Sequence, residues 1–186
     1  MTRDERFAAM EDGARRLGAD CAAVIGTDAI ALDPVFRKMC EANACGAYGT
    51  CWMCPPDAGD IDTLMNCVRS YSHALVFQRV FPLEDSFDIE GMLEAKQKHH
   101  GMCRRMREVF SGLQIGDHLL LGAGRCGICS RCAKLDGIPC RFPEEAYSSL
   151  EAHGIDVAKL AKSAGMKYTN GADTVTYFGV VLFNMQ

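Results

Sequence analysis

The sequence contains no long hydrophobic run and no strong excess of charge of either sign. No apolar stretch approaches the roughly 18 residues that a membrane-spanning helix requires, which argues against a membrane protein. The N-terminal segment MTRDERFAAMEDG is charged and has no apolar signal-peptide core, so a cytoplasmic location is the default expectation. With 20 basic and 24 acidic residues the formal net charge is -4, which gives no general attraction to nucleic acid or to anionic membranes.

Motifs of several enzyme classes are also missing. The chain has no P-loop, no Ser/His/Asp motif and no C-x3-C-x2-C triplet of the kind found in radical enzymes. The stretch 122–127 has the form G-x-G-x-x-G after an apolar run, but a dinucleotide site requires a helix to follow at once. The residues that follow continue a regular cysteine spacing instead, so we reject a nucleotide site here.

The length of 186 residues favours a single domain, 1–186, or at most one domain with a small appended module. Short apolar runs predict strands at 21–26, 29–33, 73–81, 117–124 and 174–183. Helical spacing, caps and terminating glycines predict helices at 2–17, 36–42, 61–71, 83–113, 144–154 and 155–165. We therefore expect an α/β or α+β fold, in which a mixed sheet of about four or five strands is flanked by helices and carries two cysteine-rich loops.

Cysteine is the abundant residue type, with 11 in the chain. The cytosol keeps thiols reduced, so a disulfide framework is not the expected use of these residues. Clustered thiols in a reduced compartment are better explained by ligation of a metal or an iron–sulfur cluster.

The second cysteine group lies in GRCGICSRCAKLDGIPCRFP, residues 124–143. Cys126, Cys129 and Cys132 follow a C-x2-C-x2-C pattern, and Cys140 lies shortly before a proline, as in the bacterial ferredoxin run. Small Gly127 lets the backbone approach a cubane, and positive charge favours an anionic thiolate cluster. That charge is supplied by Arg125, Arg131, Lys134 and Arg141. We predict a [4Fe-4S] cluster at this group, with zinc as the competitor.

The first group lies in MCEANACGAYGTCWMCPP, residues 39–56, where the cysteine spacing is less diagnostic. The predicted ligands are Cys40, Cys45, Cys51 and Cys54. A second iron–sulfur cluster is favoured here and a four-thiolate zinc site is the alternative. Ligands can also be exchanged between groups, as in two-cluster ferredoxins, so the pairing of thiols stays open.

Other metal-binding residue types have simpler explanations. Cys21, Cys67 and Cys103 lie in apolar patterns and are expected to be core thiols. His99 and His100 lie at helical spacing from Cys103, but the charged residues around them favour a solvated helix face over a metal site.

The two cysteine blocks resemble those of a prokaryotic family of predicted metal-binding proteins, a domain of unknown function. The resemblance also covers LEDSFDIEGM, the GIDV that follows the second block, and TVTYFGVVLF, and so spans nearly the whole chain. It implies metal ligation by the eight cysteines of the two groups and leaves the reaction open.

Two [4Fe-4S] clusters predict electron transfer or a redox accessory role with a redox protein partner. A second hypothesis is an enzyme that acts on a small molecule beside a metal. It predicts a substrate pocket lined by Tyr48, Trp52, His73 or His118. A third is a structural or sensor protein with zinc in the first group.

Overall fold

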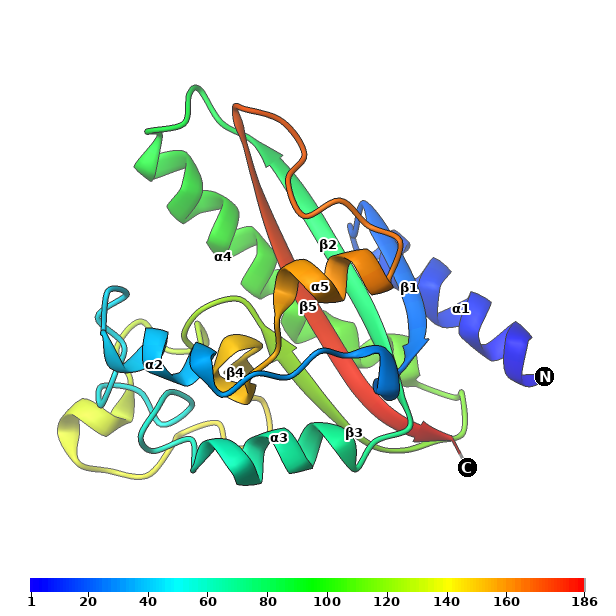
Figure 1. Ribbon diagram of the computed structural model, residues 1–186, viewed down its shortest axis with the longest axis horizontal. Coiled ribbons are helices and arrows are strands. Elements are labelled where there is room, and N and C mark those ends of the chain that lie inside the picture. The colour runs from blue at the N-terminus through cyan, green and yellow to red at the C-terminus, as the bar shows by residue number, and fades with distance from the viewer. Residues whose placement is uncertain (186) are drawn as a thin grey trace.

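A five-stranded sheet forms the centre of the computed structural model, which describes residues 1–185 (Figure 1). The strand order is β1-β2-β5-β3-β4, and all neighbours are antiparallel except β3 and β4, which are parallel. The strands are β1 (Cys21–Gly26), β2 (His73–Pro82), β3 (Ile115–Gly122), β4 (Ser148–Ser149) and β5 (Thr174–Met185). The α+β class with a mixed sheet, predicted from the sequence, is confirmed.

Helices cover both faces of this sheet. One core lies between the sheet and α1 (Arg3–Arg16), α4 (Ile89–Arg105) and the 3-10 turn η2 (Met106–Phe110). The other core lies under α3 (Ile61–Arg69) and α5 (Val157–Ser163). The remaining elements are α2 (Val35–Glu41) and the short turns η1 (Thr27–Ala29), η3 (Ala133–Asp136) and η4 (Glu151–His153).

The central strands explain why the two cores are separate. Along β2, Leu75 and Phe77 enter the first core, whereas Ala74 and Val76 enter the second. Side chains alternate across a strand, so a strand that is apolar at every position must be covered on both sides. The same pattern in β5 predicted its central place, which the strand order confirms.

Several helices begin at a capping residue that the sequence supplies. Thr2 and Glu5 form a capping box at α1, and the carboxylates of Asp60, Asp88 and Asp156 accept amide hydrogen bonds at α3, α4 and α5. Each cap satisfies an amide that the first helical turn leaves unpaired.

Two predicted elements are wrong. Residues 29–33 do not form a strand, because η1 occupies their start and only Leu32 makes a bridge, to Ile155. Residues 144–154 do not form a helix, because tertiary hydrogen bonds hold them as β4 and η4. In this segment the Ser148 hydroxyl donates to the Met53 carbonyl over 2.7 Å and the Leu150 amide donates to the Gly122 carbonyl over 3.0 Å.

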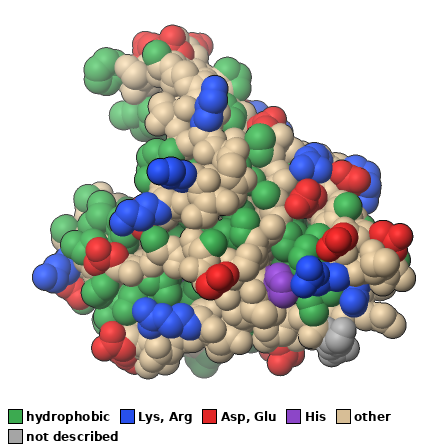
Figure 2. Space-filling model, turned by 45° about the vertical axis from the view of Figure 1, so that its right-hand side comes forward, with side chains coloured by type: hydrophobic (Ala, Val, Ile, Leu, Met, Phe, Trp, Pro, Cys, Tyr) green, Lys and Arg blue, Asp and Glu red, His purple; other side chains and the backbone are tan. Residues whose placement is uncertain are grey.

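The surface carries both charge signs. Figure 2 shows acidic and basic side chains interspersed over one face, together with a projecting end that carries hydrophobic and acidic side chains. Two exposed large hydrophobic residues lie where α4 begins: Phe87, just before the helix, is 86% exposed, and Ile89, its first residue, is 69% exposed. Within residues 1–185, no helix has the length and apolar character needed to cross a membrane.

The close approach of Phe77 to Gly179 provides a test of the sheet packing. These residues are partners across β2 and β5, and a Cβ added to Gly179 would lie 2.2 Å from the Phe77 ring. We expect Gly179→Ala to lower the free energy of unfolding by about 1–3 kcal/mol through overpacking. In a double-mutant cycle measured by urea unfolding, Phe77→Leu should relieve part of this cost. Strictly additive effects of the two substitutions would contradict the packing described.

Buried His153 provides a pH test. Its Nδ1 donates to the Ser149 carbonyl over 3.2 Å, and burial lowers its pKa to about 4. In the unfolded chain a histidine titrates near pH ~6.5, so between these values the unfolded state binds more protons and stability falls as the pH falls. We expect His153→Asn, which keeps a donor for Ser149, to flatten the pH dependence of urea unfolding between about pH 6.5 and 4. An unchanged slope would contradict a neutral buried His153.

Candidate metal centre

The two cysteine groups meet at one side of the sheet. The loop between α2 and α3 and the loop that follows β3 lie side by side there (Figure 1). The Trp52 indole donates to the Ile138 carbonyl over 3.0 Å, and Lys134 forms an ion pair with Asp57. Contacts between the loops therefore bring together thiols that are distant in the sequence.

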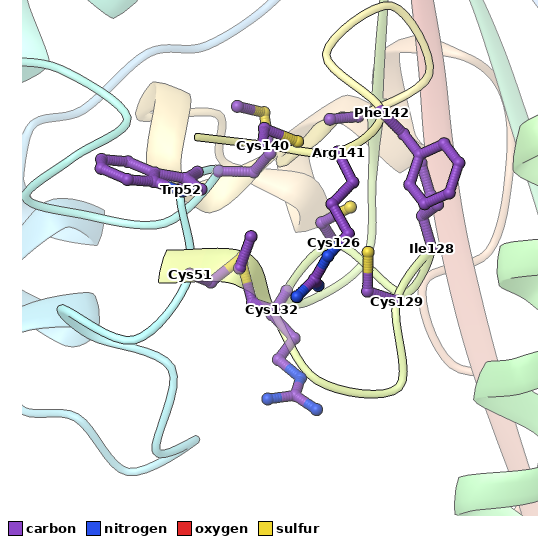
Figure 3. Close-up of a pocket in the computed structure, with 13 residues that line it drawn as sticks. Cys51, Trp52, Cys126, Ile128, Cys129, Cys132, Cys140, Arg141 and Phe142 are labelled. Atoms are coloured by element: carbon purple, nitrogen blue, oxygen red, sulfur yellow. The ribbon is translucent and has the colours of Figure 1, made fainter. Parts of the chain in front are cut away.

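The second cysteine group surrounds a small cavity of about 20 Å³, which we call the second cavity (Figure 3). Its lining includes all four predicted ligands of this group and one cysteine of the first group, Cys51. Trp52 and Phe142 also line it, so apolar rings adjoin the thiols. The four thiols of the second group are Cys126, Cys129, Cys132 and Cys140.

The other three cysteines of the first group line a neighbouring cavity of about 230 Å³, which we call the first cavity. These are Cys40, Cys45 and Cys54. Tyr48, Arg125, Ser149 and Glu151 also contribute to its wall. Within the described residues 1–185, no group of three or more His, Cys, Asp or Glu side chains converges closely enough to hold a single ion. The thiols instead line two adjacent cavities.

Cys51 and Cys54 lie at the boundary between these cavities. Both are buried, at 2% and 7% exposure, and they pack with Cys126 and Cys132. A hydrogen bond from the Cys54 thiol lowers the pKa of Cys51 against the effect of its burial, and further bonds from backbone amides and Cys132 act in the same direction as that from Cys54. The same bond raises the pKa of Cys54, and burial adds to the effect. Cys51 is thus the thiol that this environment favours as a thiolate, the form that ligates metals.

Backbone amides also point at the second group. Burial raises the pKa of the Cys126 thiol, while hydrogen bonds from the amides of Ile128 and Tyr147 oppose that rise. Amides directed at a ligand sulfur stabilise its thiolate and tune the potential of a bound cluster.

The basic residues of the second cysteine loop, residues 124–143, differ in whether their charge is already engaged with a neighbouring side chain. Arg131 and Arg141 both pair with Asp136, at 2.9 Å and 3.5 Å, and Lys134 lies 4.5 Å from the centre of the Trp52 ring. Arg125 lines both cavities and forms no ion pair with any residue in 1–185. Of the four positive charges expected at this group, Arg125 is therefore the one directed at both thiol-lined cavities.

The prediction of a solvated face for His99 and His100 is wrong, because both side chains are buried, at 0% and 7% exposure. His99 contacts the Phe178 carbonyl at 3.2 Å and the Cys103 sulfur at 3.3 Å. Burial is the main cause that lowers the pKa of His99 to about 3 and that of His100 to about 4. The charged residues near them in the sequence lie on the outer side of α4, whereas the two histidines lie on its inner side. The charge of the sequence neighbours therefore gave the wrong prediction of solvent exposure.

The His100 side chain packs against the second cysteine loop from the side of the core. Its Nδ1 is hydrogen-bonded to the Tyr147 hydroxyl, and its ring lies directly under Gly127. Tyr147 is 1% exposed and supplies the amide that points at Cys126. Tyr147 was not among the residues predicted from the sequence, because its neighbourhood in the segment 144–154 gave no sign of this role.

The remaining candidates lie elsewhere. Cys103 is a buried core thiol as predicted, whereas Cys21 is exposed and Cys67 only partly buried. His73 stacks on Phe183, and His118 stacks on Phe110, so neither joins the cysteine cavities. Tyr48 lines the larger of the two cavities and Trp52 lines the smaller one, so they do not share a single pocket.

Gly127 provides a test of the support under the second loop. A Cβ at this position would lie 2.8 Å from the buried His100 ring. We expect Gly127→Ala to displace the loop, to cost about 1–3 kcal/mol of stability and to reduce the metal bound at the second group. The matched control is Gly101→Ala, since an added Cβ there meets no atom within 4 Å, and alanine favours the helix by about 0.5–1 kcal/mol. Equal metal content and stability in the two variants would contradict the role assigned to His100.

A comparison with known proteins places the chain in a family. Residues 23–183 match the model of the family described as "predicted metal-binding protein (DUF2284)". No curated protein and no solved structure matches the chain. The matched region contains both cysteine groups and most of the sheet. The chain therefore belongs to this family of predicted metal-binding proteins.

Proposed function

We propose that the protein is an iron–sulfur protein that binds two [4Fe-4S] clusters and transfers electrons to or from a redox protein partner. The observation that carries this proposal is the meeting of eight cysteines from two chain segments around two adjacent cavities. The sequence pattern C-x2-C-x2-C supports a cubane at the second group. Two clusters at neighbouring sites would supply one-electron chemistry along a short path.

The donor set supports this assignment. The wall of the second cavity contains five thiols and no carboxylate or imidazole within the described residues, and thiolate is the soft donor that iron–sulfur clusters use. At about 20 Å³ the cavity is small, so admission of a cubane requires the two loops to move apart. The second loop is suited to such movement, since much of it is irregular backbone rather than helix or strand.

The protein's own residues would hold and tune the clusters. Cys126 receives two backbone amide hydrogen bonds, and Arg125 places positive charge beside both cavities. Both features stabilise an electron-rich thiolate cluster, so they raise its reduction potential. Trp52 and Phe142 place apolar rings on part of the wall of the second site.

The larger cavity favours a second candidate, a metal-dependent enzyme that acts on a small molecule. Its volume of about 230 Å³ and its polar residues, Tyr48 and Arg125, are suited to a small polar ligand. An enzyme would respond to its substrate by a change in the spectrum of the bound metal, whereas a pure electron carrier would respond only to its redox partner.

Metal and sulfide analysis tests the proposal. We expect protein purified without oxygen to contain about eight irons and eight sulfides per chain and to show the optical and EPR signals of two cubanes. Zinc without acid-labile sulfide would refute iron–sulfur binding and leave a structural or sensor role with zinc.

Substitution of single cysteines tests the site assignment. Cys129→Ala should remove the signal of one cluster and spare the other, because Cys129 lines only the second cavity. The matched control is Cys21→Ala, which removes an exposed thiol in β1 and should leave iron and sulfide unchanged. Retention of both cluster signals in the Cys129 variant would refute the assignment of the second group.

A further inference from the structure

We propose that Glu151 is a metal ligand of the first site, where it acts together with Cys40, Cys45 and Cys54, while Cys51 belongs to the second site. This inference rests on the proposed binding of metal by the two cysteine groups, although it does not depend on that metal being iron. It replaces the four-cysteine first group expected from the sequence with three thiolates and one carboxylate.

The distribution of the thiols leads to this assignment. Cys51 lines the second cavity, where its sulfur is hydrogen-bonded to the Cys132 thiol and to the Cys126 amide, in addition to its bond with Cys54, which lines the first cavity. The second cavity therefore has five thiols and the first has three. Metal sites with thiolate ligands usually require four protein donors, so the first site lacks one.

Glu151 occupies the wall of the first cavity together with these three thiols. It lies close enough to Cys40 for its charge to act on that thiol. Its side chain is partly buried, and its carboxylate accepts a hydrogen bond from the Ser149 hydroxyl. Glu151 forms no ion pair within the described residues, although Arg125 lines the same cavity. A bound metal ion would supply a positively charged partner for this partly buried carboxylate.

The placement of Glu151 is built into the fold. Arg37 is 8% exposed, and its guanidinium donates to the carbonyls of Gly59 and Ala152 over 2.8 and 3.4 Å. Arg37 lies one turn before Cys40 on α2, so this bond holds η4 beside the helix that carries the thiol. On the other side, the Ser149 hydroxyl accepts the Ala152 amide over 3.1 Å and fixes the start of η4. Hydrogen bonds from Arg37 and to Ser149 thus hold η4 in place, and Glu151 lies in the same cavity wall as the first cysteine group.

The chemistry of this donor set is known in proteins. Carboxylate oxygens bind zinc at distances close to those of imidazole, and they also bind iron. The donors line the cavity without converging on one point, so binding would draw them inward. With one oxygen donor, the first site would be a harder ligand set than the all-thiolate second site, and its bound metal would exchange more readily.

Cadmium-113 NMR counts the thiolates at each site independently of iron. We would express the chain in iron-limited medium with ¹¹³Cd and record its resonances. We expect one resonance typical of four thiolates and a second at higher field, typical of three thiolates and one oxygen ligand. Cys45→Ala should remove the second resonance and so identify it as the first site, because Cys45 lines that cavity alone.

Three variants then test the oxygen ligand. Glu151→Gln should shift or remove the first-site resonance, and Glu151→Cys should move it to the position of a four-thiolate site. The control Glu144→Gln changes an exposed carboxylate in the preceding loop and should have no effect. The Glu151→Cys variant keeps the test decisive if Glu151→Gln binds no cadmium or does not fold.

The outcomes separate this inference from the proposed function. Two four-thiolate resonances in the wild type, or an unchanged first-site resonance in both Glu151 variants, would overturn the role of Glu151 even if iron and sulfide are present. A mixed-ligand resonance that responds to Glu151 would support it even if metal analysis finds zinc and no sulfide.

Discussion

The hydrogen bond from Ser148 to the Met53 carbonyl is the contact on which the arrangement of the site depends. Ser148 belongs to β4, which pairs with β3 in parallel over only two residues, and its hydroxyl reaches the first cysteine loop over 2.7 Å. One residue therefore connects the sheet, the second cysteine segment and the first. Because loops by themselves are poorly ordered, such a connection to a rigid sheet is what allows thiols from two loops to lie at defined positions.

The support beneath the second loop comes from the first core. His100 and Tyr147 are buried and hydrogen-bonded to each other, and Gly127 lies against the His100 ring. Their neutral, hydrogen-bonded state satisfies two polar groups that would otherwise be costly inside a core. Polar residues thus lie in the core directly under the cysteines, where they shape the loop rather than ligate a metal. The packing of the core therefore determines the position of the second cysteine loop at this point of the molecule.

Part of the site was predictable from the sequence for a physical reason. The cysteine spacing, the flanking glycines and the neighbouring prolines are local features, and they suffice to identify both groups of thiols. The strands β2 and β5 were equally clear because complete burial requires apolar residues at every position. The segment 144–154 was predicted incorrectly, because its helix-like composition is overridden by hydrogen bonds to Met53 and Gly122.

The sequence by itself determined that this is a cysteine-rich, mixed α+β protein with two candidate metal-binding groups. Only the tertiary structure decided how those groups meet. It placed Cys51 on the cavity of the other group, turned His100 into the core and brought Glu151 beside Cys40. The reason is that ligand spacing is encoded locally, whereas the partners of each ligand are set by contacts between segments far apart in the chain. Such contacts arise from the packing of loops on the sheet, which no local pattern specifies.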